Sequence, residues 1–203
     1  MIRPEARQRI EAAITDAEKS SRAELVAVIA RRAGEYRATG LALAIIGSFI
    51  AGLAVWLLLP WSSTGEVLLA EFLVFLVLLA LLELTSLGDR LTPRALKVVA
   101  ARQLARATFL DQGLADTAER NAILFFVSRA EHHVEIIADR GIYGRVTPVE
   151  WQAIIDSFSQ SVRAGRVEEG YLAAISSLSS ILAAHFPSDG QPRNELGNRF
   201  VVL

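Results

Sequence analysis

Residues 121–141 read NAILFFVSRAEHHVEIIADRG and contain the clearest strand signals of the chain. Its first part, residues 122–127, is a continuous run of apolar and aromatic side chains, which is typical of a strand buried on both faces. Residues 134–138 form a second short apolar run, and the polar residues 130–133 between the two runs predict a tight hairpin. The stretch therefore predicts two paired strands, of which the first lies inside a sheet.

Two helices are predicted after this hairpin. Thr147-Pro148-Val149-Glu150 combines a capping box with a proline at the first helical position. The apolar side chains that follow at helical spacing are Trp151, Ile154, Ile155, Phe158 and Val162. A break at Gly165 precedes a last amphipathic helix, whose apolar residues are Tyr171, Ile175, Leu178 and Leu182. Residues 200–203 are expected to add an edge strand or to dock on the domain.

The chain before the hairpin supplies the remaining elements. Residues 4–20 have the apolar spacing of an amphipathic helix, and residues 25–30 form an apolar run short enough for a central strand. Thr92 and Pro93 are expected to open a helix that continues to about residue 110. The order of elements predicts the α/β class, as a small α/β/α sandwich in which helices cover a mixed sheet.

Two long apolar runs interrupt this domain after its first strand. Residues 41–59 contain no charged side chain, and residues 67–87 are interrupted only by Glu71, Glu83, Thr85 and Ser86. About 20 residues of helix cross a hydrocarbon core, so each run is long enough to span. The proline and glycine at residues 60–65 break the helix between them. The sequence therefore predicts a two-helix transmembrane hairpin, because a soluble domain of this size could hardly bury two such runs.

These runs divide the chain into residues 1–40, 41–87 and 88–203, of which the first and third form one domain. Basic residues flank the hairpin on both sides, whereas its connecting loop has none; they are Arg22, Arg31, Arg32, Arg37, Arg90, Arg94, Lys97, Arg102 and Arg106. The positive-inside rule then predicts two spans with both termini in the cytoplasm, and contacts between the basic residues and anionic lipids. Since Glu71 and Glu83 lie near the ends of the second run, we prefer contact with water to a transport role.

The composition excludes several classes of protein. The chain has 203 residues, a formal net charge of −1 and no cysteine. The absence of cysteine excludes a disulfide framework, a cysteine nucleophile and thiolate-bound zinc. The near-neutral charge provides no global basic field, so nucleic acid is not an expected partner.

The strand-rich stretch and the tail together resemble a known family. Residues 121–128 and 131–141, the helix with Trp151, His185-Phe186-Pro187 and Asn194-Glu195-Leu196 resemble the TPM domain family. That family includes thylakoid-lumen and photosystem II repair proteins and many bacterial membrane proteins. The resemblance covers residues 1–36 and about 91–203, with the hairpin inserted. It implies a compact α/β/α domain, a phosphatase label and, for some members, calcium binding, and it places the protein in a bacterial inner membrane.

Several polar residues near the predicted strand ends are candidate ligands. Asp139 and Glu131 are candidates for a divalent cation such as calcium, although an ion pair or a turn cap would also explain Asp139. Arg140 is expected either to clamp an anion or to pair with Asp139. Asn194 and Glu195 are expected to bind a partner or ligand, or to tie the tail to the domain. His132 and His133 are adjacent, so their side chains should point to opposite faces of a strand.

The residues supply no recognised catalytic set. The sequence contains no P-loop, no aspartate pair at one-residue spacing and no cysteine. We therefore expect a non-enzymatic accessory protein, whose cytoplasmic domain binds another membrane protein in assembly, stability or repair. The alternative is a divalent-metal-binding domain or weak phosphatase that uses Asp139.

Overall fold

A computed structural model describes residues 3–85, 87–188 and 200–203. The chain forms two compact units. The first unit comprises Met1–Ala33 and Val98–Leu203, and the second comprises Gly34–Lys97. The first is the α/β domain and the second contains the two long apolar helices.

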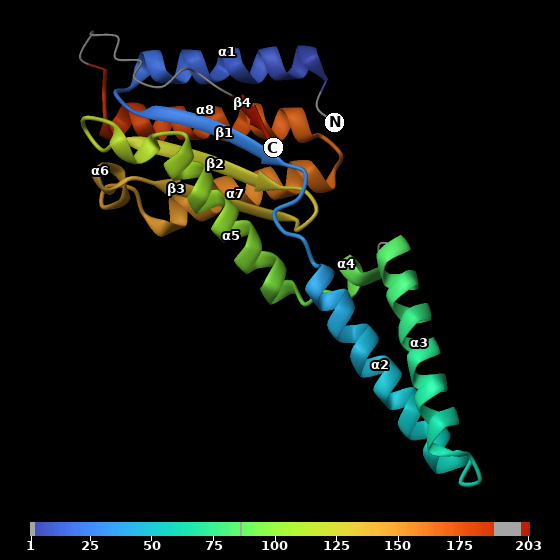
Figure 1. Ribbon diagram of the computed structural model, residues 1–203. Helices are drawn as coiled ribbons and strands as arrows, with labels where there is room; N and C mark the ends of the chain where they lie inside the picture. The colour runs from blue at the N-terminus through green and yellow to red at the C-terminus, as the bar shows by residue number, and fades with distance from the viewer. Residues whose placement is uncertain (1–2, 86, 189–199) are drawn as a thin grey trace. The chain divides into compact units, whose positions relative to one another are not determined.

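The domain is built on a four-stranded mixed sheet in the order β3-β2-β1-β4 (Figure 1). Strands β1 (Glu24–Ala30) and β2 (Ala122–Ser128) are parallel and pair over their whole length, from Glu24 with Ala122 to Ala30 with Ser128. Strand β3 (His133–Ala138) is antiparallel to β2, and β4 (Phe200–Val202) is parallel to β1. The predicted hairpin and the predicted edge strand are thus confirmed.

Helices cover both faces of the sheet (Figure 1). One face packs against α1 (Pro4–Ser20), α7 (Pro148–Arg163) and α8 (Val167–His185). The other packs against α5 (Arg94–Asp111) and the short 3₁₀ helix η1 (Leu114–Asp116). Every residue of β1 and β2 is buried, which explains why these strands are continuously apolar instead of alternating. The α/β class and the layered architecture predicted from sequence are confirmed.

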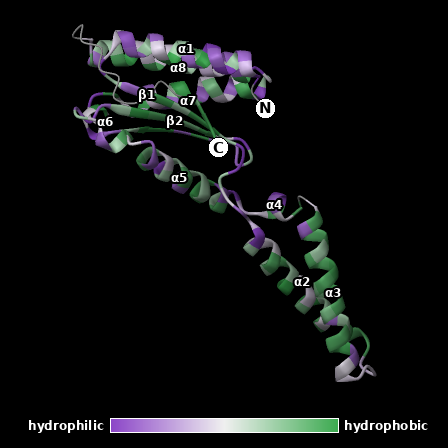
Figure 2. Ribbon diagram, turned by 45° about the horizontal axis from the view of Figure 1, so that its top comes forward, coloured by the Kyte–Doolittle hydropathy of each residue, from purple (hydrophilic) through white to green (hydrophobic). Residues whose placement is uncertain are grey.

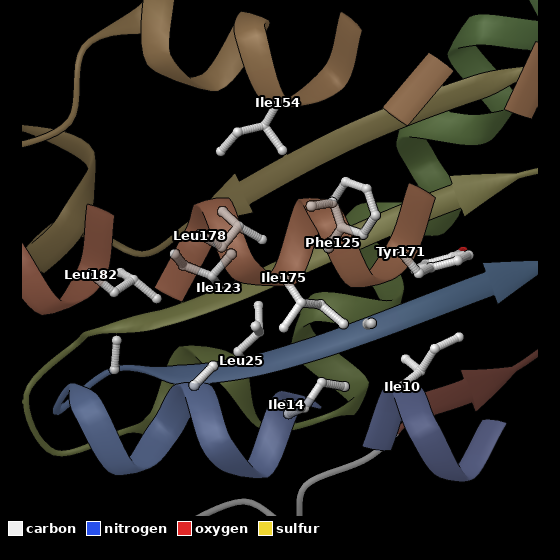
Figure 3. Close-up of a cluster of buried hydrophobic side chains, with 14 of the residues drawn as sticks. Ile10, Ile14, Leu25, Ile123, Phe125, Ile154, Tyr171, Ile175, Leu178 and Leu182 are labelled. Carbon is white, nitrogen blue, oxygen red and sulfur yellow. The ribbon is translucent and has the colours of Figure 1, made fainter. Parts of the chain in front are cut away.

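The larger core lies between the sheet and the α1/α7/α8 layer (Figure 3). Phe125 of β2 contacts Phe158 of α7 and Tyr171 of α8 edge-to-face, with ring centroids 5.0 and 5.6 Å apart. Tyr171 also contacts Phe200 of β4 at 5.2 Å. Such edge-to-face pairs each add about 0.5–1.5 kcal/mol to the burial of the rings. The aromatic cluster therefore joins four elements, β2, α7, α8 and β4, across the core.

Local sequence signals fix the ends of the helices. In α7, the Thr147 hydroxyl accepts from the Glu150 N–H, and the Glu150 carboxylate accepts from the Thr147 N–H at 2.8 Å. This hydrogen bond lowers the pKa of the Glu150 carboxyl below its usual value. Gly165 adopts φ +76° between α7 and α8, a backbone conformation that favours glycine. Both the capping box and the break at Gly165 are confirmed.

The beginning of α5 differs from the prediction. Thr92 does not cap α5, because its hydroxyl donates to the Gly88 carbonyl at 2.8 Å, within the short helix α4 (Leu87–Leu91). The Pro93 carbonyl instead accepts from the N–H groups of Leu96 and Lys97 and opens the helix. The pattern of residues alone did not predict α4, because a five-residue helix has no periodic apolar face.

The second unit contains α2 (Arg37–Leu58) and α3 (Thr64–Leu84), which pack against each other. Both are long and apolar enough to cross a membrane by length and composition. Figure 2 shows hydrophobic residues along both helices. A capping box at Ser63 and Glu66 starts α3 three residues before the predicted run. The residues of α2 that are buried within the hairpin are all small: Gly40, Ala44, Ser48 and Gly52. Small side chains at a spacing of four allow the backbones of two helices to approach closely.

Candidate functional site

Asp139 begins the short helix α6 (Arg140–Tyr143) at one edge of the sheet. Its Oδ1 accepts from the N–H of Arg140 at 2.7 Å, and its carbonyl accepts from the N–H groups of Ile142 and Tyr143. The side chain is buried, and its Oδ2 has no hydrogen-bond partner in the described structure. The nearest cation is Arg120, whose Nη1 lies 3.9 Å from Oδ2. Asp139 is therefore a helix cap with one buried oxygen still available.

The rule that places ligands at the ends of α/β strands does not apply to Asp139. That rule concerns the carboxyl ends of parallel strands. Because β3 is antiparallel, Asp139 lies at the edge where β1 and β2 begin, and its N–H donates to the carbonyl of Ala122. The carboxyl ends of β1 and β2, at Ala30 and Ser128, lie at the opposite edge.

Glu131 lies at that opposite edge, in the turn between β2 and β3. Its Oε2 accepts from the backbone N–H of Ala33 at 3.1 Å and from the hydroxyl of Ser128. The six residues of β3, which span about 20 Å at about 3.3 Å per residue, separate this turn from Asp139. The structure therefore does not bring Glu131 and Asp139 together, and Glu131 instead ties the end of β1 to the turn.

The other predicted residues are also dispersed. Arg140 is exposed, and Arg120, not Arg140, is the arginine that faces Asp139. His132 is exposed with φ +49°, whereas His133 contacts Glu135, with Nε2 and Oε2 3.0 Å apart. Asn194 and Glu195 lie outside the described residues, so their expected ligand or tail role is untested. Within the described ranges, no three histidine or acidic side chains gather as metal ligands would.

Two acids near the beginning of β1, the partly buried Glu18 and the buried Glu24, were missing from the sequence prediction. Glu18 of α1 accepts from the N–H of Leu25 at 3.0 Å. Burial raises the pKa of its carboxyl from 4.5 to about 8, against the lowering effect of that hydrogen bond, and the charge of Glu24 adds to the rise. Glu24 is buried and lies in register with Ala122. A polar residue at the end of an amphipathic helix, seven positions before a strand residue, gives no sequence signal for this contact.

An open groove of about 640 Å³ lies near the carboxyl ends of the parallel strands. Its charged lining is mixed: Arg3, Arg9, Arg129, Arg166, Glu5, Glu168 and Glu169. Arg9 Nη2 is 2.6 Å from Glu168 Oε1, and Arg166 Nε is 3.6 Å from Glu169 Oε2. Acids that neutralise neighbouring arginines leave little net field for an anion. The groove is therefore a weaker candidate for a phosphate site than its four arginines suggest.

The acids of the hairpin have protein contacts. Glu83 Oε2 lies 3.7 Å from Arg37 Nε. This ion pair is at the end of the hairpin where the chain continues into the domain. A side chain added at Gly52 would lie 3.1 Å from Glu71 Oε2, so the glycine makes room for this carboxyl group. The pairing of Glu83 with Arg37 follows from the antiparallel packing of α2 and α3.

Comparison with known proteins supports the resemblance found in the sequence. Residues 91–181 match the family model of the TPM domain. The solved NMR structure of the BA42 protein from the psychrophilic bacterium Bizionia argentinensis is similar in fold, with a TM-score of 0.63 and 16% sequence identity. The likeness covers 100% of this chain and 96% of BA42. Comparison with curated proteins gives no match.

The sandwich of α1, α5, α7 and α8 around the mixed sheet thus has a counterpart of similar fold among solved structures. The matched segment contains α5, the β2–β3 hairpin, α6, α7 and most of α8. Residues 91–181 are thus the part of the chain that is similar to the TPM domain.

Proposed function

We propose that this protein is a membrane-anchored accessory protein, in which α2 and α3 span the membrane and the TPM domain binds another membrane protein. The observation that carries the proposal is the position of the hairpin within the domain. It is inserted between β1 and β2, which are neighbours in the sheet and pair along seven residues each. A movement of the hairpin would therefore act directly on the centre of the domain, as a coupling element requires.

The exposed surface of the hairpin supports the anchoring part. The outward side chains of α2 and α3 are large and apolar, including Phe49, Leu57, Phe72 and Val77. A contiguous apolar surface of this extent is found where a protein contacts a membrane or another protein. The absence of a recognised catalytic motif from the sequence favours an accessory role over an enzymatic one.

Purification at native expression level, in mild detergent, tests the proposal. We expect the full chain to elute with one membrane protein at constant stoichiometry. A photo-crosslinking residue at Val149, which is 77% exposed on α7, provides a second readout. Elution of the chain alone, without a crosslink from any exposed position, would contradict the proposal.

A second candidate function is the binding of a divalent cation at Asp139. It is favoured by the buried Oδ2 that has no hydrogen-bond partner in the described structure, since carboxylate oxygens are the preferred ligands of calcium. Calcium should raise the melting temperature of the full protein, and Asp139→Asn should abolish the rise. Asp111→Asn, at an exposed position of α5, is the control. An unchanged melting temperature, together with unchanged turnover of a phosphate ester by Asp139→Asn, would remove this candidate.

A further inference from the structure

Helix α5 has two chemically different faces, of which only one is used by the domain. Ala101, Ala105, Thr108 and Phe109 are buried, and this face packs against the sheet. The opposite face has no partner in the described structure. A helix whose second face is also partly apolar has a surface suited to an additional contact.

The outer face of α5 consists of Val99, Arg102, Gln103, Arg106 and Leu110. These residues recur at intervals of three and four, so they form one stripe along the helix. All five are exposed, and the apolar members are 50% exposed at Val99 and 63% exposed at Leu110. The stripe therefore presents apolar side chains at both ends and two guanidinium groups between them.

The charge of this region has one sign. Between Asp89 and Asp111 the sequence contains no acidic residue but five basic ones, at positions 90, 94, 97, 102 and 106. Across the described ranges, neither Arg102 nor Arg106 forms an ion pair, in contrast to Arg7, Arg9 and Arg22. The positive charge of the outer face is thus not neutralised by the protein.

The combination of cations and apolar side chains matches an anionic lipid surface. A helix lying in the bilayer interface places apolar side chains below the headgroups and its arginines at the level of the phosphates. The position of α5 in the chain also fits this occupant. Only residues 85–93, which include α4, separate α5 from the end of α3. The tether raises the effective concentration of the face at the bilayer, so even a small apolar area suffices.

We propose that the outer face of α5 docks on the headgroups of an anionic bilayer. This contact would hold the domain against the membrane and leave the α1/α7/α8 layer available to a partner. It rests on the anchoring of α2 and α3 in the bilayer but not on partner binding, since docking requires only lipid and can be measured on the purified chain.

The absence of cysteine allows the proposal to be tested with single labels. The full chain would carry a fluorophore at Gln103→Cys on the outer face, or at Ala12→Cys on α1 as the control position. Each is reconstituted in phosphatidylcholine vesicles with or without phosphatidylglycerol, and quenching by a spin-labelled lipid headgroup is measured. With phosphatidylglycerol present, we expect strong quenching at residue 103 and little at residue 12.

Charge reversal supplies the matched variants. Arg102→Glu with Arg106→Glu should reduce quenching at residue 103 to the level at residue 12, because each arginine lost weakens docking by about fivefold. Arg3→Glu with Arg163→Glu changes the net charge equally, at the exposed N-cap of α1 and the exposed last residue of α7, and should leave quenching unchanged. Equal quenching at both labels would overturn the proposal. Quenching at residue 103 that persists without anionic lipid, or after the reversal at Arg102 and Arg106, would also overturn it.

Discussion

Gly141, in the Asp-Arg-Gly sequence after β3, lies against the backbone of Arg120. The Gly141 N–H donates to the Arg120 carbonyl at 2.9 Å, and an added Cβ would lie 2.5 Å from that oxygen. Arg120 itself has φ +53°, so this turn has little freedom to move away. The close approach of two backbones explains why a glycine is required here.

Gly141→Ala is therefore expected to destabilise the domain by about 1–3 kcal/mol, the range typical of overpacking. Thermal unfolding of the full chain in mild detergent measures the effect. Gly144→Ala is the matched control, because nothing lies within 4 Å of an added Cβ at that position. Equal melting temperatures for the two variants would show that Arg120 gives way at no cost.

The buried carboxyl of Glu18 predicts how stability depends on pH. The folded state binds the Glu18 proton more tightly than the unfolded state, since burial raises the pKa from 4.5 to about 8. The contribution of Glu18 to stability is therefore greatest below pH 4.5 and is lost as the pH rises to about 8. Glu18→Gln should flatten this decline in melting temperature, whereas Glu5→Gln, at an exposed position of α1, should not. Parallel curves for Glu18→Gln and the unchanged chain would contradict the assignment.

At the scale of elements, the packing of α2 against α3 can be tested by crosslinking. A Cβ added at Gly40 would lie 3.8 Å from the Cβ of Leu82, which is within the range for a disulfide. Gly40→Cys with Leu82→Cys should therefore crosslink readily within one chain after mild oxidation. A gel-shift assay measures the crosslinking. The pair Gly40→Cys with Leu81→Cys is the control for this register and should crosslink more slowly, because the Leu81 side chain is 46% exposed. Faster crosslinking of the Leu81 pair would show that α3 is rotated relative to α2.

Elements with strong periodic or capping signals were predictable from the sequence. The helices at residues 4–20 and 148–163 and the paired strands of residues 122–138 were predicted within about one residue, since apolar spacing, Pro4 and the Thr147 box define them. The short helices α4, η1 and α6 were not predicted. Such short helices are stabilised by tertiary contacts, such as that between Gly141 and Arg120. A local sequence pattern does not reveal these contacts.

The candidate site was less predictable than the fold, because it too depends on tertiary packing. Predicting that Asp139 and Glu131 lie near strand ends was correct, but their separation depends on the direction of β3, which places them at opposite edges of the sheet. The carboxyl of Glu18 is buried by a contact with Leu25 that requires α1 to lie on the sheet. Side chains brought together only by tertiary packing carry no signature in a single sequence.

For the molecule as a whole, we expect both ends of the hairpin to lie on the cytoplasmic side. Single cysteines at Ser62 in the connecting turn, Ala12 in α1 and Ser157 in α7 would be labelled in intact cells by a membrane-impermeant maleimide. Ser62→Cys should react directly, whereas Ala12→Cys and Ser157→Cys should react only after permeabilisation. The opposite pattern would invert the orientation, and labelling of all three at equal rates would argue against a spanning hairpin.

The pairing of β1 with β2 has a consequence for biosynthesis. Glu24 and Ala122 are register partners, so β1 leaves the ribosome 98 residues before its neighbour. At synthesis rates of about 5–20 residues per second, this delay lasts about 5–20 s. During that time the hairpin would be entering the bilayer while ELVAVIA, the sequence of β1, remains without its sheet. The nascent chain therefore needs a chaperone, or the docking of β1 on α1 alone, to keep β1 from aggregating before translation is complete.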